Sequence, residues 1–198
     1  PVGFGPDYIR EFNLRDETVK IKNADGTMTD EKITIRSTDH GPVVEEREGS
    51  VLVSRIVGLD QPHFIEQYWD MMRATNIDEF EDSLKRLQNP AFNVVYADRA
   101  GHIMYLFGGR QPVRKAVEEE PLWSYSQGIL PGNHPINLWT ETHRYTQLPR
   151  LLDPESGWIQ NANDPPWTST FPMELDPEDY PPYMAPRGGM SFRAQRSV

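Results

Sequence analysis

The sequence of 198 residues contains no cysteine. Disulfides, thiolate catalysis and cysteine-ligated zinc are therefore excluded within this chain. No run approaches the roughly 20 apolar residues that a membrane span requires. The first thirty residues also lack the charged, apolar and small-residue segments of a signal peptide. We therefore expect a soluble chain that has already been processed or truncated.

Positive charge is scarce. Twenty basic residues stand against thirty acidic ones, a net charge of -10, and the basic residues are scattered along the chain. Phosphate binding needs a clustered basic face, so nucleic acid is a poor candidate partner. The apolar content of 37% is enough for one sizeable core or for a large piece of a bigger domain.

The common catalytic motifs are absent as well. There is no glycine-rich phosphate loop and no Gly-x-Ser-x-Gly elbow. None of the five histidines is spaced four residues from another, which argues against a self-contained zinc site on a helix. Asp39 and His40 precede Gly41-Pro42, a sequence typical of a turn, and we predict a structural role for this histidine. A catalytic constellation in this chain would have to be dispersed.

Alternating side chains predict several strands. Residues 32–36 alternate as a half-buried strand does, and residues 43–44 and 51–53 flank a probable hairpin turn. The clearest hairpin joins residues 94–96 to residues 103–105.

Helical spacing predicts two helices between these hairpins. Residues 64–75 are apolar at several helical spacings, and Asn76 stands three residues before Glu79, as in a capping box. The helix predicted after Asn76 ends at Asn89-Pro90. Its apolar face consists of Ile77, Phe80, Leu84 and Leu87.

The second half of the sequence differs from the first in composition. Most of the 18 prolines and four of the five tryptophans follow Arg114. Because proline removes a backbone donor and resists helix interiors, we predict extended segments and loops that wrap a surface.

Five segments, in order, resemble the penicillin acylase family. The strongest is Gly-Trp-Ile-Gln-Asn-Ala-Asn-Asp-Pro-Pro with its lead-in, residues 148–166. The others are residues 38–43, which contain His-Gly-Pro-Val, and residues 93–105, 109–114 and 191–196. Because their order across the chain makes coincidence a poor explanation, the sequence resembles the β-subunit of an N-terminal-nucleophile amidohydrolase of this family.

The resemblance implies an α+β fold. The family fold is a four-layer αββα sandwich, two antiparallel sheets between helices. Residues 1–198 would be a single fragment of the β-subunit. Within it, residues 1–114 would supply strands, a helix pair and the central hairpin, and residues 115–198 a long extended arm rich in proline and tryptophan.

The resemblance also implies an activity. In the family, a serine freed at the N-terminus of the β-subunit attacks an amide, with its own α-amino group as base. The expected reaction is hydrolysis of the linear amide of a small N-acyl substrate, such as a β-lactam side chain, an acyl-homoserine lactone or an acylated peptide. The expected partners are the rest of the β-subunit and an α-subunit from the same precursor, in the bacterial periplasm or secreted.

Residue 1 is proline, and no segment resembles the start of the family's β-subunit. We therefore expect the serine and the backbone donor of the oxyanion hole to lie outside this chain, and the fragment alone to be inactive.

Two residues match the family's catalytic positions. Asn163, the second asparagine of Asn-x-Asn, matches the side chain that donates to the oxyanion. Its alternative reading is a turn residue before Asp164. Arg193 matches the arginine that positions this asparagine and the substrate. A solvated arginine at a helix start is the alternative, and Arg187 and Arg196 are rivals for the role.

Further residues match other family positions. Phe92 aligns with a wall of the acyl pocket, although a core aromatic is the alternative. We interpret Trp139 and Trp158 as packing anchors. Several family members bind calcium through oxygen ligands, and Glu174 and Asp176, with Asp179 nearby, lie in a suitable stretch. The alternative is that these acidic residues are only solvated.

Two other hypotheses stay open. A non-catalytic binding module could hold peptide or glycan with tryptophans, and would need Trp123, Trp139 and Trp158 exposed on one face. A pure assembly piece would leave the chemistry to a partner chain.

Overall fold

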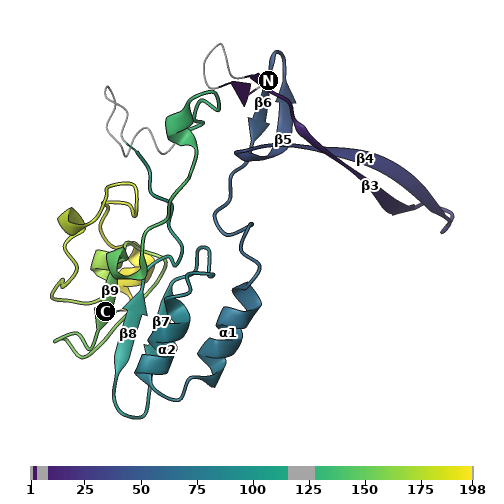
Figure 1. The fold of residues 1–198 in the computed structure, drawn as a ribbon. Helices are drawn as coiled ribbons and strands as arrows, with labels where there is room; N and C mark the ends of the chain where they lie inside the picture. Colours follow the sequence, from purple (N-terminus) through teal and green to yellow (C-terminus); the bar gives the residue numbers. More distant parts are fainter. Residues whose placement is uncertain (1, 4–8, 116–127, 198) are drawn as a thin grey trace. The chain divides into compact units, whose positions relative to one another are not determined.

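The computed structural model describes residues 2–3, 9–115 and 128–197 (Figure 1). It divides into two compact units. The first comprises Pro1–Ile56 and Ile129–Trp139, and the second Val57–Gly128 and Thr140–Val198. Antiparallel sheets and separate helices occur together, as the α+β expectation requires. No helix in the described ranges is long and apolar enough to cross a membrane.

The first unit is made of strands. A four-stranded antiparallel sheet has the order β3-β4-β5-β6, and β1 pairs with β2 separately. The strands are β1 (Val2–Gly3), β2 (Ile9–Arg10), β3 (Asn13–Lys22), β4 (Met28–Thr38), β5 (Gly41–Arg47) and β6 (Ser50–Val53).

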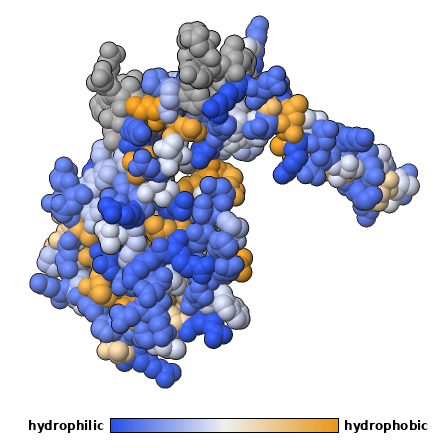
Figure 2. Space-filling view, viewed as in Figure 1, coloured by the Kyte–Doolittle hydropathy of each residue, from blue (hydrophilic) through white to orange (hydrophobic). Residues whose placement is uncertain are grey.

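Strands β3 and β4 form a long hairpin that projects from the rest of this unit (Figure 1). The predicted strand at residues 32–36 is present as the middle of β4, but the half-burial predicted for it is wrong: residues 32–34 are all exposed and residues 35 and 36 are both partly buried. Every side chain of β3 is exposed, and its surface is mostly hydrophilic (Figure 2). Charged residues occupy both faces of β3, and polar and apolar side chains alternate only over residues 18–22, so alternation does not mark the whole strand.

The predicted hairpin of β5 and β6 is also confirmed. Gly41, the first residue of β5, has a positive φ of 140°, and a Cβ at this position would clash with the carbonyl oxygen of Ser54. His40 is buried in the turn, where its Nε2 lies 3.0 Å from the carbonyl oxygen of Gly132. The structural role predicted for this histidine is therefore confirmed.

The second unit holds the helices and a three-stranded antiparallel sheet of order β7-β8-β9. Its helices are α1 (Phe64–Arg73), α2 (Ile77–Leu84) and α4 (Phe192–Gln195). Its strands are β7 (Val94–Ala97), β8 (Ile103–Leu106) and β9 (Arg150–Leu152).

Both predicted helices are present, with small differences at their ends. Asn76 caps α2, because its Oδ1 accepts from the backbone N–H of Glu79 at 2.9 Å. The Glu79 carboxylate accepts from the backbone N–H of Thr75 at 2.8 Å instead of returning to Asn76, so the predicted capping box is displaced by one residue. Helix α2 ends at Leu84, earlier than predicted, and Leu87 adopts a positive φ of 49°.

The core lies on both faces of the β7-β8-β9 sheet. Central strand β8 is almost fully buried, because its side chains alternate between two clusters. Met104 and Leu106 pack with α2 on one face, and Tyr105 packs with Leu151 and Leu175 on the other. The first cluster contains Ile77, Phe80, Leu84, Leu87, Val94, Met104, Leu106, Tyr145, Leu148 and Met184.

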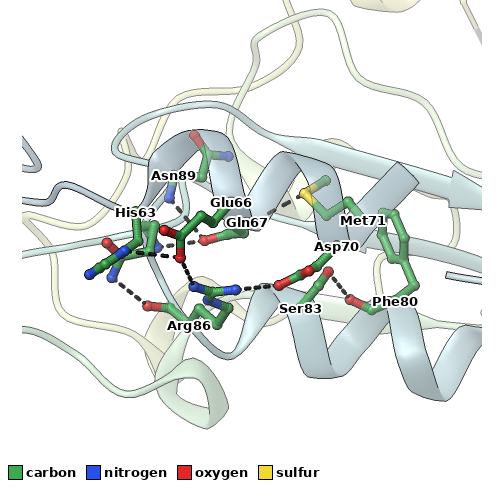
Figure 3. A network of polar contacts seen from close by, with 10 residues as sticks. His63, Glu66, Gln67, Asp70, Met71, Phe80, Ser83, Arg86 and Asn89 are labelled. Atoms are coloured by element: carbon green, nitrogen blue, oxygen red, sulfur yellow. Dashed lines mark hydrogen bonds and ion pairs between the residues drawn. The ribbon is translucent and has the colours of Figure 1, made fainter. Parts of the chain in front are cut away.

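A polar network joins α1 to the segment after α2 (Figure 3). The buried side chain of Gln67 accepts, through Oε1, from the backbone N–H groups of Gln88 at 2.6 Å and Asn89 at 3.2 Å. Arg86 pairs with Glu66 at 2.9 Å and also with Asp70. These contacts satisfy buried donors and fix the chain just before it enters β7.

Beyond residue 128 the chain consists mainly of loops and 3-10 turns, as its proline content predicts. The turns are Pro135–Asn137, Tyr145–Gln147, Pro166–Thr168 and Pro177–Asp179. Strand β9 was not predicted, because three residues are too few to show alternation. It pairs with β8, so this half of the chain contributes to the core.

Asp153 links the end of β9 to the β7–β8 hairpin. Its carboxylate accepts from the backbone N–H of Ile103 at 2.9 Å and lies 2.7 Å from Nδ1 of His102. The hydrogen bond and the charge of Asp153 raise the pKa of His102, and the same hydrogen bond lowers the pKa of Asp153.

Leu84→Ala should destabilise the protein by about 2–5 kcal/mol, because it leaves a cavity between α2 and the sheet. Leu84 is 1% exposed. Urea denaturation measures the change, with Leu59→Ala as control, since Leu59 is 70% exposed. Equal effects of the two substitutions would contradict this account of the core.

His102→Asn should destabilise the protein more at pH 6 than at pH 9. The folded state favours protonated His102, so this contribution is present below its ordinary pKa of about 6.5 and is lost as the pH rises through the raised value. Thermal melts of both proteins at the two pH values test this. A difference in Tm that does not change with pH would rule it out.

Candidate functional site

The asparagine predicted to be catalytic lies at the tip of a turn. Asn163 is exposed and has a positive φ of 63°, a conformation that asparagine tolerates better than most residues. Its backbone N–H faces Oδ1 of Asn161 at 3.3 Å. Pro165 and Pro166 follow and are buried, which stiffens the exit from the turn.

Arg193 sets the orientation of the Asn163 carboxamide. Its Nη2 donates to Asn163 Oδ1 at 3.0 Å and to the carbonyl oxygen of Ala162. A guanidinium can only donate, so the carboxamide must turn its oxygen to Arg193 and its Nδ2 away. Among the described residues, no hydrogen bond uses Nδ2 of Asn163. The turn therefore presents an N–H donor that has no partner in the described part of the chain.

The two rival arginines lie elsewhere. Arg187 donates to the carbonyl oxygens of Tyr180, at 2.7 Å, and Pro177. Of the hydrogen bonds within the described residues, none joins Arg196 to Asn163. Arg193 is the arginine that the fold brings to the predicted asparagine.

The short helix α4 is fastened to the same turn. Ser191 caps α4, and its Oγ donates to Oδ2 of Asp164 at 2.9 Å. Ala194, on the inner side of the helix, is fully buried. The start of α4, and with it Arg193, is thus held against the residue that follows Asn163.

An amide network connects the turn to the sheet. Nδ2 of Asn93 donates to Oδ1 of Asn161 at 3.2 Å, and Nδ2 of Asn161 donates to the hydroxyl of Tyr105 at 3.3 Å. The backbone N–H of Gly108 donates to Oδ1 of Asn93 at 2.9 Å. Neither Asn161 nor Asn93 was predicted to belong to the site, although both lie within the segments that resemble the family.

Phe92 is not a core residue. It is 59% exposed and sits in a turn built by Asn89, whose Nδ2 donates to the Phe92 carbonyl oxygen at 3.0 Å. The next residue, Asn93, bonds to Asn161. Phe92 therefore lies at the end of the hairpin that holds the Asn163 turn.

The two predicted calcium ligands, Glu174 and Asp176, are too few to form a calcium site by themselves. Asp176 uses Oδ1 to accept from the backbone N–H of Glu178 at 2.9 Å, and Glu174 is exposed. Across residues 9–115 and 128–197, no three His, Cys, Asp or Glu side chains come together as a metal site. An ion bound by Glu174 and Asp176 would need ligands from other parts of the protein, so calcium stays a prediction.

The binding-module hypothesis depends on exposed tryptophans. Trp139 is partly buried, with the guanidinium of Arg55 5.5 Å from its ring centre. Trp158 is also partly buried, and the two belong to different units. Trp123 lies outside the described residues. Trp139 and Trp158 thus have the partial burial of packing residues.

Comparison with known proteins decides the family. The model of the penicillin amidase family matches residues 5–198. This chain belongs to that family. The resemblance inferred from the five sequence segments is therefore confirmed.

Curated relatives of this chain are considerably longer. Acyl-homoserine lactone acylase QuiP of Pseudomonas fluorescens strain Pf-5 is 26% identical over 77% of this chain and 19% of its own length. Penicillin acylase 2 proenzyme of Pseudomonas sp. strain SE83 is 28% identical over 80% of this chain and 20% of its own length. The chain thus spans about a fifth of the length of these relatives.

A solved structure shares the fold. The thermostable penicillin G acylase of Alcaligenes faecalis superimposes with a TM-score of 0.65 at 21% identity, over 79% of this chain and 27% of the other. The penicillin amidase family member described here therefore has part of the penicillin acylase fold.

Asn163→Ala should be less stable than Asn163→Gly by about 1 kcal/mol, because a Cβ is disfavoured at positive φ and glycine is not. Urea denaturation of both variants measures this difference. In helix α2, at exposed Asp82, the order should reverse, since glycine costs up to about 1 kcal/mol there. Alanine more stable than glycine at both positions would contradict the turn geometry.

Proposed function

We propose that this chain is part of a penicillin-acylase-like amidohydrolase that cleaves the linear amide of a small N-acyl substrate. The nucleophile is a serine at the N-terminus of the β-subunit, outside this chain, and its α-amino group is the base. This chain contributes Asn163 to the oxyanion hole. The observation that carries the proposal is the carboxamide of Asn163, which is held by Arg193 and whose N–H donors have no partner among residues 9–115 and 128–197.

The chemistry requires a donor of this kind. When the serine oxygen adds to the amide carbon, the carbonyl oxygen becomes an oxyanion. A preorganised N–H placed at that oxygen stabilises the tetrahedral intermediate more than the ground state. Nδ2 of Asn163 fills this role, because the turn and the arginine fix it before the substrate arrives.

Arg193 acts on the reaction through Asn163. Its hydrogen bond to Oδ1 draws electron density toward the oxygen of the carboxamide, which makes the opposite N–H groups better donors. The guanidinium charge also favours negative charge nearby. Arg193 is thus a positioning and polarising residue.

Phe92 forms part of the wall for the acyl group. Acyl pockets are mostly apolar with few polar groups, and Phe92 offers an exposed ring at the end of the hairpin that holds Asn161. The names of the relatives include acyl-homoserine lactone acylases and a penicillin acylase, so both substrate classes are candidates.

The proposal extends to the rest of the parent enzyme. The sheet β7-β8-β9 and helices α1 and α2 belong to a four-layer αββα sandwich completed by the rest of the β-subunit and by an α-subunit. The chain alone lacks the nucleophile and does not turn over substrate. The enzyme acts in the periplasm or outside a bacterial cell, and Glu174 and Asp176 contribute to a structural calcium site.

Asn163→Asp in the complete enzyme is the sharpest test. Aspartate fits the same turn and still accepts from Arg193, but it cannot donate to an oxyanion. We expect kcat to fall by about 10²–10³, measured with an acyl-homoserine lactone and with a penicillin side-chain amide.

The matched control is Asn133→Asp, another exposed asparagine, which should retain the parental kcat. Wild-type kcat in Asn163→Asp would remove the oxyanion role from this residue.

A further inference from the structure

We propose that Asn161 is a positioning residue for the acylase reaction, which fastens the Asn163 turn to the β7–β8 hairpin and so fixes where the catalytic N–H points. This inference rests on the proposed function of Asn163. The residue touches no reacting atom and acts only through its neighbour.

The hydrogen bonds of Asn161 leave its carboxamide one orientation. Oδ1 lies 3.3 Å from the backbone nitrogen of Asn163 and 3.2 Å from Nδ2 of Asn93. A backbone N–H can only donate, so the oxygen must face these two groups. Nδ2 of Asn161 is then directed to the hydroxyl of Tyr105, 3.3 Å away.

The far ends of the network are rigid. Tyr105 is 0% exposed and lies on central strand β8, paired with Val95 and Leu151. Burial raises the pKa of Tyr105, so its hydroxyl stays neutral and can accept the hydrogen bond. Asn93 is fixed in turn, because its Oδ1 accepts from the backbone N–H of Gly108 at 2.9 Å.

The turn needs such a support. Asn163 holds a positive φ of 63° without being glycine, and residues in sparsely populated conformations persist only where their surroundings hold them. Arg193 holds the side chain of Asn163 from one side, and Asn161 holds its backbone from the other. Two points of attachment together define the direction of the Asn163 Nδ2–H bonds.

The rate of the acylase reaction should therefore depend on Asn161. Without Asn161 the Asn163 turn loses its link to the sheet, and a displacement of about 1 Å at a catalytic group can cost on the order of 100-fold in rate. Substrate binding through the acyl pocket would be little affected. Loss of Asn161 should therefore lower kcat and leave KM almost unchanged.

A double-mutant cycle in the complete enzyme tests this dependence. We expect Asn161→Ala to lower kcat about 10- to 100-fold, with KM changed less than about twofold. In an Asn163→Asp background the same substitution should lower kcat by less than about twofold further, because the group it positions is already lost. Equal losses in both backgrounds would overturn the proposal.

A conservative variant separates positioning from folding. Asn161→Asp keeps an acceptor for Asn163 and Asn93, and the Tyr105 hydroxyl can rotate to donate to it. It should retain kcat within about threefold of the parent, because all three hydrogen bonds survive. If Asn161→Ala does not fold, a loss of kcat in Asn161→Asp as large as in Asn163→Asp overturns the proposal, and retention supports it.

The matched control is Asn23→Ala, which also removes side-chain hydrogen bonds within a turn, to Thr27 and Thr29, but in the β3–β4 hairpin. It should leave kcat unchanged. The failure of the underlying function has its own signature, since wild-type kcat in Asn163→Asp alone would exclude the oxyanion role whatever Asn161 does. If Asn163→Asp lowers kcat as expected but Asn161→Ala lowers kcat equally in the wild-type and Asn163→Asp backgrounds, only the positioning role of Asn161 is excluded.

Discussion

A guanidinium has hydrogen-bond donors and no acceptor, and this constraint organises the candidate site. Because Arg193 donates to the carboxamide oxygen of Asn163, the amide nitrogen must face the other way. An exposed asparagine would otherwise rotate freely, because water can donate to its oxygen and accept from its nitrogen in any orientation. The pairing converts a common turn residue into a directed N–H donor, which is what stabilisation of an oxyanion requires.

The fold supplies the fixed frame for this donor. The β7-β8-β9 sheet is covered on one face by α2 and on the other by residues from the second half of the chain, so its central strand cannot move independently of the core. Tyr105 extends this rigidity to Asn161. The network around Gln67 does the same for Asn89 and hence for Phe92 (Figure 3). Packing and polar contacts thus determine the placement of exposed groups.

Sequence could predict the elements with strong periodicity. The helical spacing of residues 64–75 and the alternation around residues 94–105 were clear, and both the helix and the hairpin are present. The cap at Asn76 is present as well. Strand β3 was not predicted because charged residues occupy both of its faces and only residues 18–22 alternate. Strand β9 was not predicted because it is too short. For the candidate site, resemblance to the family predicted Asn163, Arg193 and Phe92, and the fold brings Arg193 to Asn163. Local pattern alone would have made Asn163 an ordinary turn residue. Contacts such as Asn93 to Asn161 join residues 68 positions apart, and only the folded chain brings them together.

The most direct test of the central claim is a crystal structure of the complete enzyme with a tetrahedral transition-state analogue bound to its serine. The account predicts that Nδ2 of Asn163 lies about 2.7–3.1 Å from the oxyanion of the analogue, with Arg193 still on Oδ1 and Asn161 still on the backbone. An analogue whose oxyanion is held by other donors, with Asn163 turned away from it, would contradict the account.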